Sequence, residues 1–198
     1  MTARLGRDLP PLGDRRRLRI GLLGGSFNPA HEGHLHVSRE ALKRLRLDQV
    51  WWLVSPQNPL KSAGGMASLD KRLAGARTMA AHPKIVVTDV ERRLGTTRTA
   101  RTLALLAKRY PNLSFVWLVG ADNLAQMPQW WRWTHIFKAV RVAVFDRSPY
   151  SYKALAGAAA KRFGQARTAS LWRNTAPAWT YIAMRRHPAS ATALRAKH

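Results

Sequence analysis

The sequence has 198 residues, of which 46% are hydrophobic, and this length and composition predict one globular domain rather than a disordered chain. It contains no cysteine, which excludes disulfides, thiolate zinc sites and cysteine nucleophiles. The formal net charge of +24 predicts attraction to polyanions, whether nucleic acid or a polyphosphate ligand. No apolar run approaches the roughly 18 residues of a membrane span, so we expect a cytoplasmic protein without a membrane partner.

The hydrophobic pattern divides the chain into alternating strands and helices. Residues 1–17 lack periodicity and are expected to form a flexible basic leader, followed by a single domain over residues 18–198. Short apolar runs predict strands at 18–24, 50–54, 85–88, 115–119, 140–145 and 179–183. Helical spacing predicts helices at 32–46, 68–81, 99–109 and 152–163, with short helical pieces over 123–138. This alternation indicates an α/β fold with a doubly wound parallel sheet.

Ligands of such sheets bind beyond the carboxyl ends of the strands, at the point where the strand order reverses. The loops after the first, fourth and fifth predicted strands therefore face one crevice. They carry Gly24–His34, Gly120–Asp122 and Asp146–Arg147. We expect the functional site to lie among these three loops.

The first of these loops, residues 24–34 with the sequence GGSFNPAHEGH, has the features of a phosphate-binding turn. Its glycines let backbone N–H groups approach an anion closely. The helix that follows adds unpaired N–H donors and a partial positive charge at its N-terminus. His31 and His34 place two further donors at the same end. The turn offers neither a nucleophile nor a pair of carboxylates, so it is suited to holding phosphates and stabilising charge.

Other phosphate and metal motifs do not fit this loop. Its glycines are misspaced for the dinucleotide fingerprint GxGxxG, and the GK[ST] ending of a P-loop is absent. A zinc-protease HExxH motif would need histidine at the position of Leu35. His31, His34 and His36 lack a clear further ligand, and we predict no protein-bound metal site.

The spacing His31-x-Gly33-His34 resembles the HxGH nucleotidyltransferase superfamily, and the whole turn is similar to that of the nicotinate-nucleotide adenylyltransferases. Further segments resemble elements of this family in the same order, namely 58–61 (NPLK), 120–123 (GADN), 130–136 (WWRWTHI) and 190–195 (SATALR). Each segment alone is a weak signal. Together they extend the resemblance over residues 19–195.

The resemblance implies a Rossmann-like nucleotidyltransferase fold and transfer of the adenylyl group of ATP, carried with Mg²⁺, to nicotinate mononucleotide. Because the substrate supplies the nucleophile, the protein contributes positioning and charge stabilisation. By resemblance, His34 donates to the α-phosphate, His31 holds the triphosphate and Arg195 neutralises the β- and γ-phosphates. The other implied ATP-binding residues are Gly24, Gly25, Ser26, Phe27, Gly120, Asp122, Ser190 and Thr192.

The acceptor nucleotide carries a flat pyridine ring with a carboxylate, which needs an aromatic face and nearby donors. The substrate-binding residues that the resemblance implies are Asn28, Lys61, Thr99, Trp130, Trp131 and Arg147. Trp130 is expected to stack on the ring, and amides near Thr99 to select nicotinate over nicotinamide. The sequence departs from the family pattern at Asn28, where aspartate is common, and at Arg98, where tyrosine is common.

Two alternatives fit the sequence less well. Pantetheine-phosphate adenylyltransferase shares the phosphate turn and a similar C-terminal segment, but does not need the GADN and tryptophan segments. A nucleic-acid-binding module would explain the basic charge, but helix-turn-helix, RNA-recognition and zinc-finger patterns are absent, and we expect no specific nucleic-acid partner. Trp130 and Trp131 are also compatible with packing roles. The sequence leaves homo-oligomer formation open.

Overall fold

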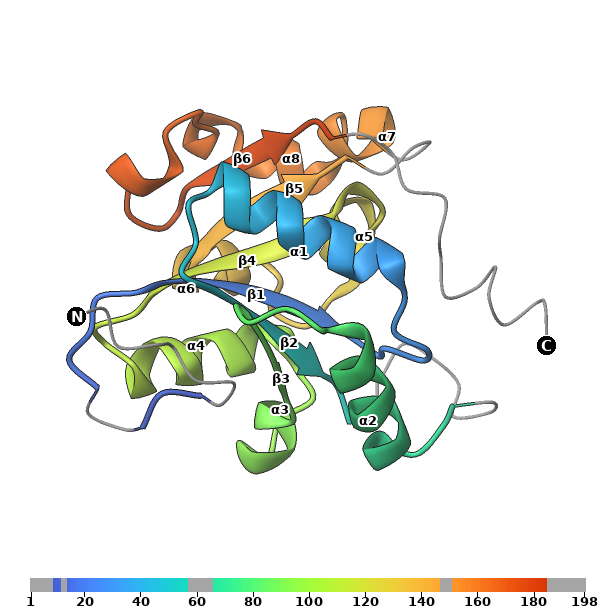
Figure 1. The fold of residues 1–198 in the computed structure, drawn as a ribbon. Helices are drawn as coiled ribbons and strands as arrows, with labels where there is room; N and C mark the ends of the chain where they lie inside the picture. The colour runs from blue at the N-terminus through green and yellow to red at the C-terminus, as the bar shows by residue number, and fades with distance from the viewer. Residues whose placement is uncertain (1–8, 12–13, 57–65, 147–150, 185–198) are drawn as a thin grey trace.

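The computed structural model describes residues 9–11, 14–56, 66–146 and 151–184, and a six-stranded sheet organises them (Figure 1). The strands are β1 (Arg19–Gly25), β2 (Gln49–Val54), β3 (Ile85–Thr88), β4 (Ser114–Gly120), β5 (Arg141–Phe145) and β6 (Trp179–Ile182). Every neighbouring pair is parallel, in the order β3-β2-β1-β4-β5-β6. Each strand begins and ends within a residue of its predicted position, because strands buried on both faces are continuous apolar runs. The predicted doubly wound parallel sheet is confirmed.

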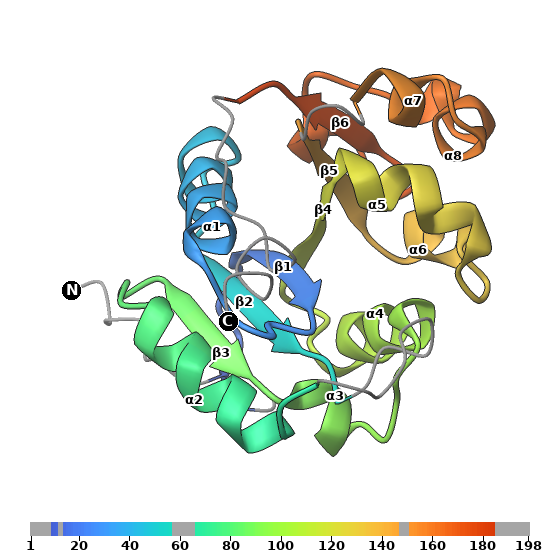
Figure 2. The ribbon, with the colours of Figure 1, turned by 90° about the vertical axis from the view of Figure 1, so that its right-hand side faces the viewer.

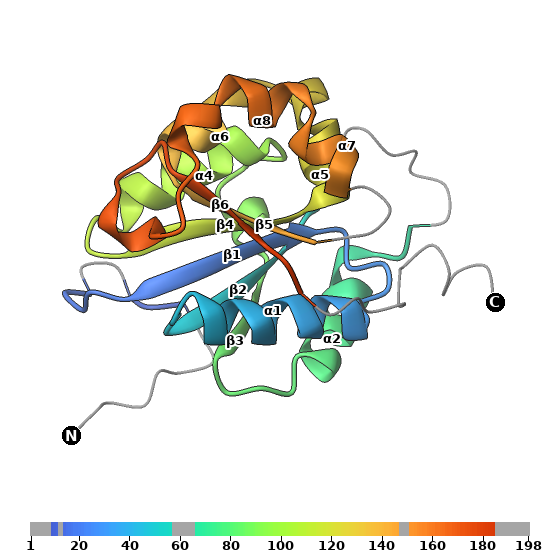
Figure 3. The ribbon, with the colours of Figure 1, turned by 90° about the horizontal axis from the view of Figure 1, so that it is seen from above.

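Helices cover both faces of this sheet, as Figure 3 shows. On one face lie α1 (Glu32–Arg44) and α2 (Leu69–Met79). The other is covered by α4 (Thr99–Arg109), α5 (Ala121–Gln126), α6 (Thr134–Ala139), α7 (Ser151–Leu155) and α8 (Ala158–Arg162). The shorter elements are α3 (Val90–Arg93) and the 3-10 turns η1 (Met127–Gln129), η2 (Gly164–Ala166) and η3 (Leu171–Arg173). One apolar core lies on each side of the sheet, so the neighbouring strand residues Leu22 and Leu23 belong to different cores.

The two largest differences between the α-helices and their predicted positions concern α3 and the region of residues 152–163. Helix α3 is not predicted, because one turn of helix is too short for a hydrophobic period to show. The helix predicted over 152–163 is instead the pair α7 and α8, which separate at Gly157. This glycine is extended, with φ −77° and ψ 169°, and a Cβ there would lie 3.1 Å from the Lys153 carbonyl oxygen. Ser68 caps α2 as predicted, since its hydroxyl accepts a hydrogen bond from the Lys71 N–H.

The strand order reverses between β1 and β4, so the chain leaves these two strands toward opposite faces of the sheet. Figure 2 views the sheet from the edge at which the strands end. Because β1 and β4 are paired in parallel, the loops that follow them begin side by side at this edge. The fold thereby places the predicted phosphate turn at the switch point. Within the described ranges, no helix is long and apolar enough to cross a membrane.

Candidate active site

The turn between β1 and α1 is built around two capping histidines. His31 is the N-cap of α1, and its Nδ1 atom accepts a hydrogen bond from the Gly33 N–H at 3.1 Å. The Nδ1 atom of His34 accepts from the His31 N–H at 3.2 Å. These are the reciprocal hydrogen bonds of a capping box, formed here by two imidazoles. The ring centroids lie 3.9 Å apart.

This capping determines which ring nitrogen of each histidine can donate. A ring nitrogen that accepts a hydrogen bond carries no proton, so the neutral form of each imidazole holds its proton on Nε2. His31 is 5% exposed and His34 is half-buried. The pair therefore supplies two Nε2–H donors at the N-terminus of a helix, where the helix dipole favours anions.

Aromatic packing holds His34 in place from the sheet. Phe27 has a φ of 47°, a left-handed conformation that is rare for a bulky residue. Its buried ring stacks on Trp52 at 5.0 Å and lies 4.6 Å from the His34 ring. The Trp52 indole N–H donates to the Ser38 hydroxyl, which donates to the His34 carbonyl oxygen, each at 2.8 Å. His34 is thus fixed through both its ring and its backbone, as a preorganised donor must be.

The switch point itself is tightly packed. Gly24 of β1 lies against the indole of Trp117 on β4, and a Cβ built on Gly24 would lie 2.2 Å from the indole Cη2 atom. Gly120 ends β4 and is the N-cap of α5, whose first turn contains Asp122. The glycine turn and the Gly120–Asp122 segment therefore follow neighbouring strands, as the sequence predicts for residues that bind one nucleotide.

The start of α4 supplies a second helix N-terminus at this edge. Thr99 is its first residue, and the side chain of the N-cap residue Arg98 makes no capping hydrogen bond. An N-terminus without a side-chain cap is suited to an anionic group. Asn28 is placed differently, because its Oδ1 atom accepts a hydrogen bond from the Ala67 N–H at 3.2 Å. Asn28 therefore also ties the phosphate turn to the segment that leads into α2.

The predicted tryptophans differ in exposure. Trp130 is half-buried and packs against the apolar core, whereas Trp131 is 44% exposed, with the Arg132 guanidinium 4.9 Å from its ring. Trp131 thus presents the more accessible ring, although the sequence suggests Trp130 as the stacking residue. The other predicted residues, Lys61, Arg147, Ser190, Thr192 and Arg195, lie outside the described residues, as do leader residues 1–8.

Two buried charges at the same edge are not predicted from the sequence. Arg72 on α2 is 4% exposed, and its burial lowers the pKa of the guanidinium. Glu91 on α3 is 6% exposed, and desolvation raises the pKa of its carboxyl group against the opposing effect of hydrogen bonds from the Thr102 and Ser55 hydroxyls. Neither residue belongs to a motif, and a charged residue on an amphipathic helix normally indicates a solvent-facing position.

The raised pKa of Glu91 makes stability depend on pH. The folded protein binds this proton more tightly than the unfolded chain, so the stabilisation is complete below the ordinary value of 4.5 and is lost as the pH rises through the higher folded-state pKa. We expect Glu91→Gln, which cannot ionise, to gain stability relative to the parent protein as the pH rises above 4.5, measured by urea denaturation. Glu40→Gln, which removes a carboxylate paired with Arg44 on α1, is the control substitution. A difference that stays constant with pH would contradict this expectation.

Comparison with known proteins agrees with this arrangement. The family model of cytidylyltransferase-like proteins matches residues 22–197. The solved structure of Plasmodium falciparum nicotinic acid mononucleotide adenylyltransferase complexed with NaAD matches with a TM-score of 0.68 and 17% identity, over 90% of this chain and 83% of that one. An identity this low supports the fold alone. The parallel sheet with a phosphate turn at its switch point defines a nucleotidyltransferase of the Rossmann-like fold.

Similar proteins with curated names indicate which family of nucleotidyltransferases this chain resembles. A protein of Methylorubrum extorquens strain PA1, named "Probable nicotinate-nucleotide adenylyltransferase", is 50% identical over 91% of this chain and 100% of its own length. A protein of the same name from Parvibaculum lavamentivorans is 61% identical over 69% of this chain and 68% of its own length. The chain belongs to the nicotinate-nucleotide adenylyltransferase family.

Proposed function

We propose that this chain transfers the adenylyl group of ATP to nicotinate mononucleotide, giving nicotinate adenine dinucleotide and pyrophosphate in NAD biosynthesis. The observation that carries the proposal is 50% identity over 91% of the chain to a relative named for this activity. The phosphate turn with its two imidazole donors at the switch point supports it. The same similarity favours nicotinate mononucleotide over phosphopantetheine as the acceptor.

In the proposed reaction, a phosphate oxygen of the acceptor attacks the α-phosphorus of ATP, and pyrophosphate leaves. No protein group is covalently modified, so catalysis rests on alignment and on stabilising the charge that builds on the α-phosphate. We assign the His34 Nε2–H as the donor to this phosphate and the His31 Nε2–H as a donor to the rest of the triphosphate. Backbone amides of residues 24–27 would complete the turn, and Arg195 would neutralise the β- and γ-phosphates.

The other roles follow from the placement of each residue. Asp122, in the first turn of α5, would accept hydrogen bonds from ribose hydroxyls. The amides at Thr99 would meet the carboxylate of the pyridine ring, because they begin a helix without a side-chain cap. Trp130 and Trp131 are the candidate aromatic faces. Further phosphate contacts are proposed for Asn28, Lys61, Arg147, Ser190 and Thr192.

The donor set of the turn fits a metal ion that arrives with the nucleotide. Amides and imidazole N–H groups bind phosphate oxygens, and among the described residues no group of three or more His, Asp or Glu side chains gathers to hold a metal ion. Mg²⁺ would therefore be held by the ATP phosphates and water, where it neutralises phosphate charge. We also propose a cytoplasmic location, where ATP is available, and one domain over residues 18–198 after a basic leader.

The test is pyrophosphate release from Mg-ATP with nicotinate mononucleotide, nicotinamide mononucleotide and phosphopantetheine in parallel. We expect release with nicotinate mononucleotide. Release with phosphopantetheine alone would preserve the reaction class and replace the acceptor. Absence of release with all three acceptors, from protein shown to be folded by circular dichroism, would overturn the proposed activity.

A further inference from the structure

A chain of buried polar contacts runs along the edge at which β1, β2 and β3 end, from the phosphate turn to the start of α4. Its members, which we call the polar brace, are Arg72, Ser55, Glu91 and Thr102. They come from α2, the residue after β2, α3 and α4. Arg72, Glu91 and Thr102 are 4%, 6% and 1% exposed. The brace thus connects the end of β2 with α2, α3 and α4.

The first half of the brace consists of the hydrogen bonds of the Arg72 guanidinium group. Its Nη1 atom donates to the carbonyl oxygens of Ser26 and Ser55, both at 2.7 Å. Its Nη2 atom donates to the Pro56 carbonyl at 2.8 Å, and its Nε atom to the Ala67 carbonyl at 2.9 Å. Arginine suits this position because its five N–H donors lie in a rigid plane. One side chain therefore ties the phosphate turn to the end of β2 and to the segment before α2.

The second half is centred on Glu91. Its carboxylate is hydrogen-bonded by the Ser55 hydroxyl and accepts from the Thr102 hydroxyl at 2.9 Å, while its carbonyl oxygen accepts from the Thr96 N–H at 3.1 Å. The Thr102 hydroxyl also lies 3.2 Å from the carbonyl oxygen of Arg98, the N-cap of α4. The contacts that begin at Ser26 thus end beside Thr99, the residue proposed to meet the acceptor.

Ion pairing does not account for the burial of these two charged residues. In the described part of the chain, Arg72 and Glu91 form no ion pair with each other or with another side chain. Burying a charge costs solvation free energy, and here only neutral hydrogen-bonding groups offset that cost. What the brace provides is a fixed geometry across four elements, and fixed geometry is what a reaction between two bound phosphates requires.

We propose that the polar brace sets the spacing between the ATP-phosphate turn and the N-terminus of α4 that receives the acceptor. Arg72, Glu91 and Thr102 are then positioning residues, since they act through the backbone segments they hold. The inference rests on the proposed function, because that function assigns the ATP phosphates to the turn and the acceptor to the start of α4. The brace itself can be tested without turnover.

The substitution that disrupts the polar brace with the smallest structural change is Thr102→Val, which removes one hydroxyl and leaves the shape of the side chain nearly unchanged. Thr78 on α2 offers a matched control, because its hydroxyl donates to the carbonyl four residues earlier, that of Ala74, at 3.2 Å and contacts no carboxylate. Thr78→Val therefore also removes a hydrogen bond from a hydroxyl to the carbonyl oxygen four residues earlier, but it leaves every contact of the brace in place. Thr102→Ser restores the hydroxyl and should rescue every property that Thr102→Val loses.

Two readouts separate a brace from an ordinary core contact. In the substrate-free protein, Thr102→Val should accelerate amide hydrogen exchange about fivefold, both in the phosphate turn and at the start of α4. Thr78→Val should accelerate exchange in neither segment. The KM for nicotinate mononucleotide should rise about tenfold well below the melting temperature, with kcat changed less, because spacing governs how the acceptor is held.

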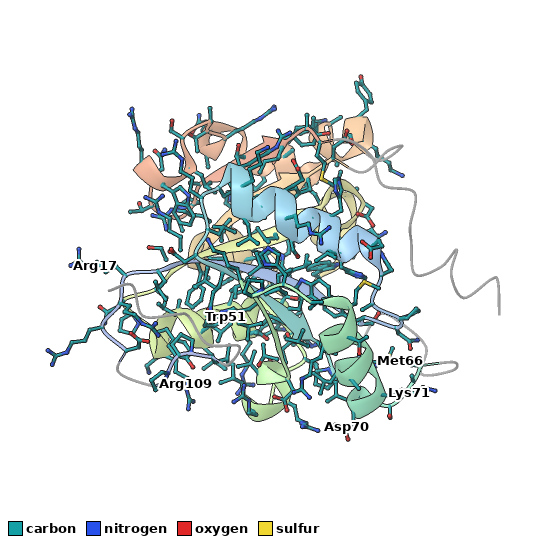
Figure 4. All side chains as sticks on the ribbon, viewed as in Figure 1. Arg17, Trp51, Met66, Asp70, Lys71 and Arg109 are labelled. Atoms are coloured by element: carbon teal, nitrogen blue, oxygen red, sulfur yellow. The ribbon has the colours of Figure 1, made fainter. Side chains whose placement is uncertain are left out.

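A second pair of variants tests the other half of the brace. Arg72→Lys keeps the charge but cannot span the four carbonyls, and Arg77→Lys makes the same change at an exposed position on α2. Figure 4 shows Asp70 and Lys71 on the outer side of this helix, away from the sheet. We expect Arg72→Lys, but not Arg77→Lys, to accelerate amide hydrogen exchange at the start of α4 and to raise the KM for nicotinate mononucleotide. If Arg72→Lys does not fold, the results for Thr102→Val and Thr102→Ser test the proposal on their own.

The outcomes are distinct. Release of pyrophosphate by the parent protein with no change in exchange or KM in Thr102→Val would overturn the brace, even if the melting temperature fell. Faster exchange at the start of α4 alone would also overturn it, because the two ends would not be coupled. If the parent protein does not use nicotinate mononucleotide, the proposed function fails, while the exchange measurements still decide whether the two segments are joined.

Discussion

Replacing His34 by asparagine should abolish most adenylyl transfer and leave the fold intact. We expect kcat to fall about 10²–10³-fold, the usual loss when one donor to a developing negative charge is removed. The reason is that the Nε2–H of His34 is the proposed donor to the phosphate, since Nδ1 accepts the His31 N–H. Pyrophosphate release at saturating Mg-ATP and nicotinate mononucleotide measures the loss.

Asparagine separates this chemical role from the structural one. Its side-chain oxygen can accept the His31 N–H in place of Nδ1, so the capping hydrogen bond is kept while the Nε2 donor is removed. Both substitutions remove the ring contact to Phe27, and His34→Ala also removes the capping acceptor, so it should be less stable than His34→Asn by about 0.5–2 kcal/mol. Equal kcat losses in the two variants, with a lower melting temperature in His34→Ala than in His34→Asn, would assign the rate to the donor.

His82 provides the matched control for this substitution. Its Nδ1 atom also accepts a backbone N–H, that of Lys84 at 3.1 Å, but it lies just before β3 and so at the opposite edge of the sheet. His82→Asn should leave kcat unchanged. A His34→Asn protein that kept a large part of the parent kcat would show that the donor to the α-phosphate is another group.

The parts of this molecule that sequence predicts well are those encoded by contiguous residues. Each strand is a short apolar run between breakers, so its position follows from local pattern. The phosphate turn lies within residues 24–34, and its glycines, histidines and following helix are read together. The family resemblance was confirmed for the same reason, because it rests on several such segments in order. The roles of individual site residues stay predictions.

The parts that sequence does not predict depend on residues far apart in the chain. Arg72 contacts Ser26 across 46 positions, and no local pattern distinguishes it from the solvent-facing Arg77 on the same helix. The motif predicts that His31 and His34 are donors, but which nitrogen of each ring could donate follows only from the capping geometry. The greater exposure of Trp131 is likewise set by how the segment packs against the core.

Gly24→Ala should destabilise the protein more than most single substitutions of this size. The new Cβ would lie 2.2 Å from Cη2 of Trp117, and 3.1 and 3.2 Å from two further ring atoms. This indole is 5% exposed within a packed core, so it cannot move without displacing its neighbours. We expect a loss of about 2–3 kcal/mol in the free energy of unfolding, or roughly 5–10 °C in Tm for a chain of this size. The lower entropy of the unfolded alanine variant offsets only about 0.4–1 kcal/mol of the clash.

The adjacent glycine and the indole itself test this explanation. A Cβ on Gly25 would approach the Phe27 ring no closer than 3.4 Å, an ordinary contact, so Gly25→Ala should melt close to the parent protein. Trp117→Phe removes the outer part of the indole, and because Nε1 of Trp117 has no hydrogen-bond partner among the described residues, no such bond is lost. In the double variant with Gly24→Ala, the losses should fall short of their sum by about 1–2 kcal/mol in urea denaturation. Additive losses would place the destabilisation in the backbone of β1, and the indole would then not be the reason for a glycine at this position.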